Sequence, residues 1–232
     1  MNPSNLKTIA EPRSRKEIIN IVNRIKDSFE MKSMFFPVCK FLEILPVVDE
    51  TLDLEYVENK ELPSNTYAYY DPVNNLMMID EEVYLRACNG VARDRFTIAH
   101  EIGHYFLVDK VMYTRKSDEK IPAYCDPEWQ ANAFASELLM PSRKILHMPV
   151  SSIVRECKVS YQAAEIALKN AKKVKLFALT RLLSLQPIPQ YEDSYNDIFF
   201  SSSLYHTGNR FARYILKFLR KEWIVCTNIV HT

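Results

Sequence analysis

The stretch RFTIAHEIGHYFLVD, residues 95–109, places two histidines four residues apart in an apolar sequence. On an α-helix, residues at this spacing lie on one face, about 6 Å apart along the axis, so His100 and His104 can point at one metal ion. Glu101 is turned by about 100° around the helix, beside the pair and near the open coordination position. A carboxylate there can take a proton from water at the metal. The stretch therefore predicts a helix that carries part of a catalytic metal site.

The surroundings of the motif favour a metal over a helix that merely carries three polar residues. The other side chains of the stretch are largely apolar: Phe96, Ile98, Ala99, Ile102, Phe106 and Leu107. Unpaired polar side chains would be costly to bury among them, and one metal ion accounts for all three. Gly103 costs the helix about 1 kcal/mol relative to Ala, so we expect a neighbouring segment or a substrate to approach closely there.

A catalytic zinc site normally has three protein ligands, and Glu128 is the candidate for the third. Asp126 suits the N-cap of a second helix, Pro127 its first position and an acidic residue its first turn. Glu128 is preferred to the competing carboxylates Asp118, Glu119 and Asp126 because it lies on this rigid helix. Asn132, one turn after Glu128, is expected to bind the second ring N–H of a ligand histidine.

Hydrophobic periodicity predicts helices with two regions of strand. The expected helices are 15–29, 81–109 with a break at Asn89-Gly90, 126–140, and a helix-turn-helix-like pair over 151–173 that turns at 158–160. The expected strands are 51–58 and a hairpin over 66–80, while 40–48 suits a short helix or a strand and 110–125 is expected to be irregular. An edge strand beside a metal helix commonly holds an extended peptide, although a plain hairpin explains the same pattern.

Composition places the chain among ordinary globular proteins. Its 232 residues are 47% hydrophobic and 25% charged, enough for one domain with an appendage or for two small domains. Only three glycines argue against a β-sandwich or barrel with many tight turns. The expected class is therefore helix-rich α+β.

Cysteine usage and hydropathy indicate a cytoplasmic protein. No apolar run approaches the roughly 18 residues of a membrane span, and the opening residues 1–16 contain no secretory signal. The five cysteines are scattered and lack a C-x-x-C pair, which favours reduced thiols over a disulfide framework or a thiolate zinc site. The other histidines, His147, His206 and His231, stand alone and are expected to be surface or hydrogen-bonded residues.

Charge is spread unevenly along the chain. Residues 151–232 carry a balance of +6 and residues 1–150 a balance of −5. A balance of +6 is modest beside that of a dedicated nucleic-acid binder.

Two blocks, RFTIAHEIGHYFL at 95–107 and EWQANAFASELLMP at 128–141, resemble in order and spacing the ImmA/IrrE family of zinc metallopeptidases. This family is common in bacterial genomes and on mobile elements. YYDPVNNLMMIDE at 69–81 is similar to the strand pair that precedes the family's metal helix. The resemblance covers about residues 15–170.

The resemblance implies a helix-rich, zincin-like α+β core with a small, mostly antiparallel sheet over residues 1–148. A helix-turn-helix-like segment would follow over 149–184, and an extension of unknown role over 185–232. His100 and His104 fall on the family's histidine ligands of a single Zn²⁺, Glu101 on its catalytic glutamate and Glu128 on its acidic ligand. Where many relatives have a second acid, this chain has Gln130.

The resemblance further implies the substrate and the reaction. Family members typically cleave a helix-turn-helix (Xre-like) transcriptional repressor and so relieve repression. The leading hypothesis is therefore a cytoplasmic zinc endopeptidase in which Glu101 acts as the base. Tyr69, Tyr70 and Tyr113 are candidates for stabilising the oxyanion.

Two alternatives remain open. A DNA-binding or regulatory protein with a structural or sensory zinc site is supported by 151–173 and by the basic C-terminal part. Its second helix offers Lys169, Lys172 and Lys173 but only Gln162 near its start, so base readout is weak and packing on the core is favoured. The other alternative is an interaction module whose peptidase stays silent until a partner docks.

Overall fold

The computed structural model describes residues 6–64, 66–107, 112–115 and 121–183. Its elements are β1 (Leu6–Ile9), α1 (Arg15–Ser28), α2 (Val38–Val48), β2 (Asp53–Val57), η2 (Asn59–Glu61), β3 (Ala68–Asp71), β4 (Leu76–Asp80), α3 (Glu81–Cys88), α4 (Ala92–Leu107), β5 (Met112–Arg115), η3 (Ala123–Cys125), α5 (Pro127–Leu139), α6 (Ser142–Ile145), α7 (Val150–Cys157) and α8 (Tyr161–Leu183). The fold is the helix-rich α+β arrangement that the sequence predicts.

The larger sheet has the strand order β2-β4-β3. The hairpin β3–β4 is antiparallel, as predicted, and β2 pairs with β4 in parallel. Met77 and Ile79 of the central strand β4 are fully buried. β3 lies at the edge of this sheet, with β4 as its one strand neighbour in the described residues.

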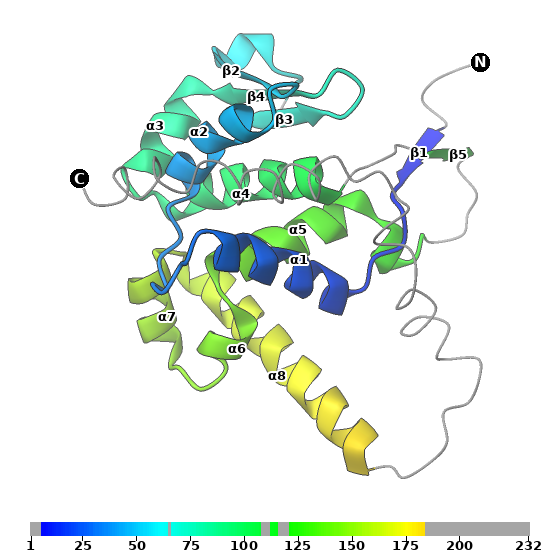
Figure 1. Ribbon diagram of the computed structural model, residues 1–232, viewed down its shortest axis with the longest axis vertical. Coiled ribbons are helices and arrows are strands. Elements are labelled where there is room, and N and C mark those ends of the chain that lie inside the picture. Colours follow the sequence, from blue (N-terminus) through cyan, green and yellow to red (C-terminus); the bar gives the residue numbers. More distant parts are fainter. Residues whose placement is uncertain (1–5, 65, 108–111, 116–120, 184–232) are drawn as a thin grey trace.

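α4 occupies the middle of the molecule (Figure 1). The sheet, α2 and α3 lie on one side of it, and α5 and α1 lie on the other, with α6, α7 and α8 beyond (Figure 1). α1 buries Ile18, Val22 and Ile25 of its predicted apolar face and begins with a capping box between Ser14 and Glu17. This arrangement covers α4 on most sides.

The approach of α5 to α4 is closest at Gly103. A Cβ atom built on Gly103 would lie 3.1 Å from both Cα and O of Ala131, and 3.2 Å from Cδ1 of Phe134. The expectation of a close neighbour at this glycine is confirmed, and the neighbour is the backbone of α5. A larger residue at 103 would push the two helices apart.

Arg95 ties α4 to the opposite side of the molecule. It is 2% exposed and donates to the carbonyl oxygens of Phe36 at 3.0 Å, Lys158 at 3.2 Å and Cys157 at 3.4 Å. The last two carbonyls end α7, where a cation is favourable because the helix dipole is negative there. Burial lowers the pKa of the guanidinium, but these carbonyls solvate it in place of water.

One prediction about local structure is wrong. Part of the region expected to be irregular, residues 112–115, forms β5 and pairs antiparallel with β1. The partners lie about a hundred residues apart in the chain, so periodicity within either segment does not reveal the pairing. The ambiguous segment 40–48 lies within the helix α2, which continues through Pro46.

The C-terminal helices agree with the sequence. α7 and α8 are separated by a turn at Lys158, whose backbone φ of 54° is left-handed. Residues 158–160 contain no asparagine, which adopts this conformation more readily than lysine. α8 buries Ala164, Ala167, Leu168 and Ala171.

No helix in the described ranges is long and apolar enough to cross a membrane. The boundary after residue 148 stays a prediction, and the extension 185–232 lies outside the described residues.

We predict that Gly103→Ala destabilises the protein, although alanine has the higher helix propensity by about 1 kcal/mol. The added Cβ meets backbone atoms of Ala131, which cannot rotate away as a side chain could. Urea denaturation should show a lower midpoint. Unchanged or increased stability would contradict the close packing of α4 on α5.

Candidate metal centre

His100 and His104 on α4 and Glu128 on α5 converge on one point. One ligand atom from each lies within 4.8 Å of the others, and together they form the one such group found in the described residues. The two histidines come together because they are four residues apart on one helix face. Glu128 joins them because α5 starts at Asp126, whose side chain accepts from the Glu128 amide at 3.0 Å.

The distances suit a tetrahedral ion. The two histidine Nε2 atoms are 3.0 Å apart, and the Glu128 carboxylate oxygens lie 3.2 Å from Nε2 of His100 and 3.3 Å from Nε2 of His104. An ion bonded at 2.0–2.1 Å holds its tetrahedral ligand atoms about 3.3–3.4 Å apart. The Glu128 side chain is 66% exposed, so this side of the triangle faces solvent. Two imidazoles and a carboxylate with an open side can hold a divalent metal and leave room for water.

Asn132 contacts the outer side of His100, as the sequence predicts for its position. The Nδ1–H of His100 donates to Oδ1 of Asn132 at 3.2 Å. An amide oxygen can only accept, so this contact keeps the proton on Nδ1 and leaves the Nε2 lone pair for a metal.

The residues of the cluster also shift one another's pKa values. In the absence of a metal, contacts with the imidazoles of His100 and His104 hold the pKa of Glu128 well below its usual range. Burial disfavours the charged form of His100, but the contact with Glu128 outweighs it and raises the pKa of His100. The acidic residue is therefore a carboxylate at neutral pH, the form that binds metal.

Glu101 lies at the buried side of the cluster and is 8% exposed. Burial raises the pKa of its carboxyl, while His104, His100 and a hydrogen bond from the Tyr70 backbone N–H act in the opposite direction. The side chain is thus placed between the metal-binding group and β3. The contact from the strand backbone is a feature that the sequence did not reveal.

The aromatic side chains beside the cluster belong to a second network. Tyr105 donates to Asp49 at 2.8 Å, and Tyr70 donates to Asn75 at 2.8 Å, with the two rings 5.7 Å apart. The Tyr70 hydroxyl is therefore engaged away from the cluster, which makes it a weak oxyanion candidate. Tyr69 is 41% exposed on β3.

Several other residues singled out in the sequence do not lie at the metal-binding group. Gln130 is buried, and its Nε2 donates to the carbonyls of Glu11 and Tyr124, both at 2.7 Å. It anchors the N-terminal segment instead of facing the metal-binding group. The side chain of Tyr113 lies outside the described residues, as do Asp118, Glu119, His206 and His231. His147 is exposed and belongs to no metal-binding group in the described residues.

Residues 56–169 match the family model described as the IrrE N-terminal-like domain, Peptidase_M78. The matched segment includes β3, β4 and α4, the helix α5 with Glu128, and the first part of α8. It agrees with the resemblance seen in the sequence, and it crosses the predicted domain boundary at 148. No curated protein matches the chain.

We predict that Glu128→Gln weakens the binding of a divalent metal ion by more than about 100-fold, because it removes the one anionic ligand atom of the group. Zn²⁺ titration calorimetry of the metal-free protein measures this. The matched control is Asp126→Asn, which changes the neighbouring carboxylate and keeps a capping oxygen. Equal affinities of the two variants would rule out Glu128 as a ligand.

We also predict that Asn132→Ala lowers metal affinity by about 10–100-fold, because the His100 ring loses the acceptor that orients it. Asn132→Asp, which retains an acceptor oxygen, should bind metal better than Asn132→Ala. If Asn132→Ala bound zinc as tightly as the unchanged protein, the orienting role would be wrong.

Proposed function

Residues 56–169 belong to the IrrE N-terminal-like peptidase family, and on that premise we propose that the protein is a zinc-dependent endopeptidase. The observation that carries the proposal is the convergence of His100, His104 and Glu128 with Glu101 directly beside them. The donor set of two imidazoles and one carboxylate is typical of catalytic zinc.

The residues of the site have separate roles in the proposed reaction. His100, His104 and Glu128 would hold the ion, and a bound Zn²⁺ would polarise the scissile carbonyl and acidify a water. Glu101 accepts the proton of the attacking water and passes it to the leaving amine. Its placement on the same helix as two ligands keeps the carboxylate at a constant distance from them.

The edge strand β3 is the second part of the proposed site. It packs beside α4, and its backbone reaches the cluster through the Tyr70 N–H. An edge strand beside a metal helix commonly holds an extended substrate by backbone hydrogen bonds, without needing a particular sequence. This favours the peptide-holding interpretation of the hairpin over a purely structural one.

We infer that the natural substrate is a helix-turn-helix transcriptional repressor, whose cleavage relieves repression. The support is the family resemblance together with the peptidase family match. The test is to incubate the purified protein with the repressor encoded next to its gene, with and without a chelator. Cleavage that needs zinc supports the inference, and an intact repressor in both reactions argues against this substrate.

The DNA-binding alternative gains no support from α7 and α8. α8 buries Ala164, Ala167, Leu168 and Ala171, which matches a role in packing on the peptidase core. Tyr161, Gln162 and Glu165 are exposed at its start, and the acid among them would repel phosphate.

We predict that Glu101→Gln keeps zinc but abolishes cleavage, with a loss of at least about 100-fold in rate. The amide preserves the shape of the side chain and cannot accept the proton. Zinc content by elemental analysis and cleavage of the repressor by gel electrophoresis are measured on one sample. Full cleavage by this variant would contradict Glu101 as the base.

A further inference from the structure

Two cysteines on neighbouring helices lie in contact with each other. Cys39 is in the first turn of α2, and Cys88 is the last residue of α3. The Cys39 thiol is hydrogen-bonded to Cys88. The two residues are far apart in the sequence, so no local spacing marks them as a pair. Their contact is a product of the fold, and it lies apart from the metal ligands on α4 and α5.

The packing of α2 against α3 accounts for this contact. The Tyr84 hydroxyl of α3 donates to the Glu43 carboxylate of α2. Glu43 comes four residues after Cys39, and so lies on the same face of α2. Tyr84 comes four residues before Cys88, on the same face of α3. Helices that run in opposite directions and meet at 43 and 84 therefore meet again one turn further on, at 39 and 88.

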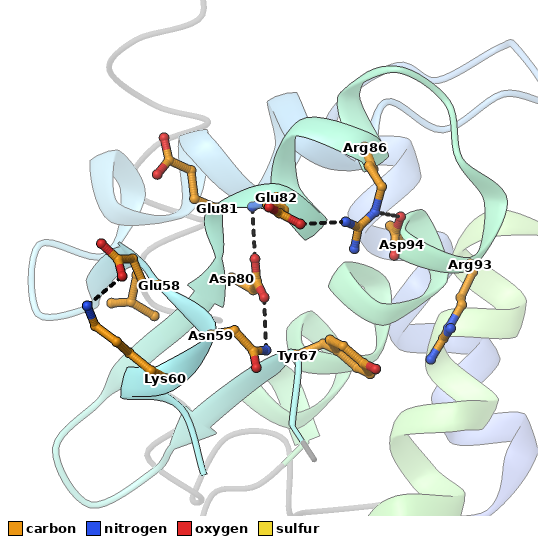
Figure 2. A pocket seen from close by; sticks show the side chains of 11 residues that line it. Glu58, Asn59, Lys60, Tyr67, Asp80, Glu81, Glu82, Arg86, Arg93 and Asp94 are labelled. Atoms are coloured by element: carbon orange, nitrogen blue, oxygen red, sulfur yellow. Dashed lines mark hydrogen bonds and ion pairs between the residues drawn. The ribbon is translucent and has the colours of Figure 1, made fainter. Parts of the chain in front are cut away.

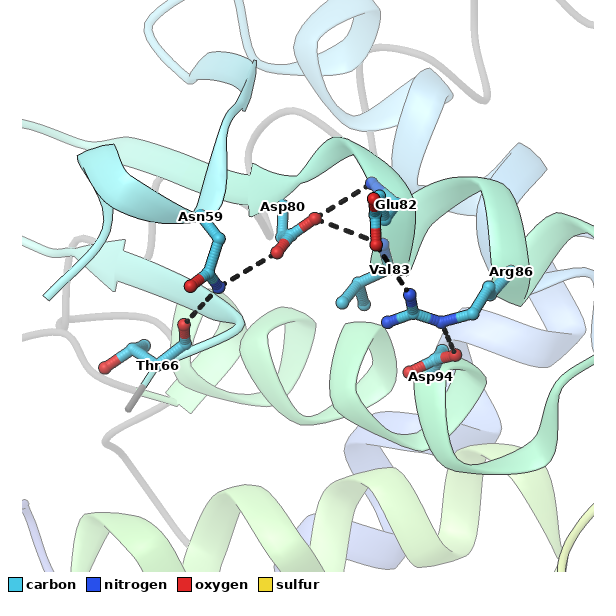
Figure 3. Close-up of polar contacts among 7 residues, drawn as sticks. All are labelled: Asn59, Thr66, Asp80, Glu82, Val83, Arg86 and Asp94. Carbon is cyan, nitrogen blue, oxygen red and sulfur yellow. Dashed lines mark hydrogen bonds and ion pairs between the residues drawn. The ribbon is translucent and has the colours of Figure 1, made fainter. Parts of the chain in front are cut away.

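Two charged residues of α3, Glu82 and Arg86, lie on a different face from the thiol. Each comes two residues before a member of the pair Tyr84 and Cys88, a rotation of about 200° around the helix. Figure 2 shows both of them lining a pocket together with Asp94 at the start of α4. Arg86 binds Glu82 at 3.2 Å and Asp94 at 2.8 Å (Figure 3). These contacts tie one face of α3 to α4 and leave the face with Cys88 to α2.

The two thiols differ in exposure and in protonation. Cys88 is exposed, whereas Cys39 is only 9% exposed. Burial and the hydrogen bond with Cys88 raise the pKa of the Cys39 thiol to about 12, although Arg95 acts in the opposite direction. Cys39 is therefore a protonated thiol at neutral pH, and the thiolate is the form that reacts. An oxidant dissolved in water reaches Cys88 first.

We propose that Cys88 and Cys39 form a peroxide-sensitive pair, in which hydrogen peroxide oxidises Cys88 and Cys39 then closes a reversible disulfide between α3 and α2. An accessible cysteine beside a second, resolving cysteine is the usual arrangement of a redox sensor. This inference goes beyond the proposed peptidase function and does not depend on it.

The reaction balances in two steps. The Cys88 sulfur attacks one oxygen of the peroxide and the O–O bond breaks, which gives a sulfenic acid, while the thiol proton leaves with the other oxygen as water. The Cys39 sulfur then attacks the Cys88 sulfur and the S–O bond breaks, while the Cys39 proton leaves with the hydroxyl group as a second water. The two thiols lose two electrons in total, which reduce one peroxide to two waters.

The position of Cys88 allows the bond to form. The two sulfur atoms have to approach to about 2 Å, so one of the side chains must move. Cys88 is the last residue of α3, and the turn Asn89-Gly90 follows it. Gly90 has a φ of +86°, and a Cβ atom built on it would meet nothing within 4 Å. The end of α3 therefore has room to shift toward Cys39.

The test treats the purified full chain with a small excess of hydrogen peroxide and then alkylates the remaining free thiols. The monomer is isolated on a non-reducing gel, so that any cross-link in it is intramolecular, and is digested with trypsin for mass spectrometry. Trypsin releases Cys39 in SMFFPVCK, residues 33–40, and Cys88 in ACNGVAR, residues 87–93. We expect these two peptides joined by a disulfide, and dithiothreitol should restore both thiols.

Three variants separate the roles of the cysteines. Cys88→Ser should lose the cross-link and leave Cys39 free for alkylation, because the thiol that peroxide reaches is gone. Cys39→Ala, which buries no unpaired hydroxyl, should also lose the cross-link. In this variant Cys88 should react with dimedone, which traps sulfenic acids, and proceed to the sulfinic acid. Cys125→Ser, which changes a partly exposed cysteine in η3, is the matched control and should keep the cross-link.

Several outcomes would overturn the proposal. Peroxide treatment that leaves both thiols of the pair free for alkylation is one of them. Another is a Cys88 sulfinic acid in the unchanged protein with Cys39 still free, because Cys39 then does not resolve the sulfenic acid. A disulfide from Cys88 to any other cysteine refutes the pairing. None of these measurements uses zinc or cleavage, so their failure leaves the proposed peptidase function standing.

Discussion

The contact between α4 and α5 at Gly103 is the constraint on which the candidate site depends. A Cβ atom at this position would lie 3.1 Å from backbone atoms of Ala131, closer than an ordinary contact, so the glycine sets how near α5 can bring Glu128 to His100 and His104. Helix propensity alone disfavours glycine here. The residue is explained by the position of a ligand on the neighbouring helix, and the local cost to α4 is offset by the packing it permits.

α4 buries three charged side chains, and each of them has a partner on another segment: Asp94, Arg95 and Glu101. Arg95 binds carbonyls from the loop before α2 and from the end of α7, whereas Glu101 meets the backbone of β3. Removing one partner would leave a charge buried without compensation, which costs several kcal/mol. These contacts hold α4 between the sheet and the C-terminal helices and so give the metal-binding group a rigid base.

Sequence reasoning was most successful where the signal is local. The break at Asn89-Gly90 and the start of α5 at Asp126 follow from turn and capping chemistry, and the structure has both. Pairings between distant segments were less accessible, because the parallel β2–β4 contact and the β1–β5 pair leave no periodic trace in either partner. The same limit applies to the site: helical spacing groups His100 with His104, but the Tyr70 amide is a backbone group that no residue pattern marks.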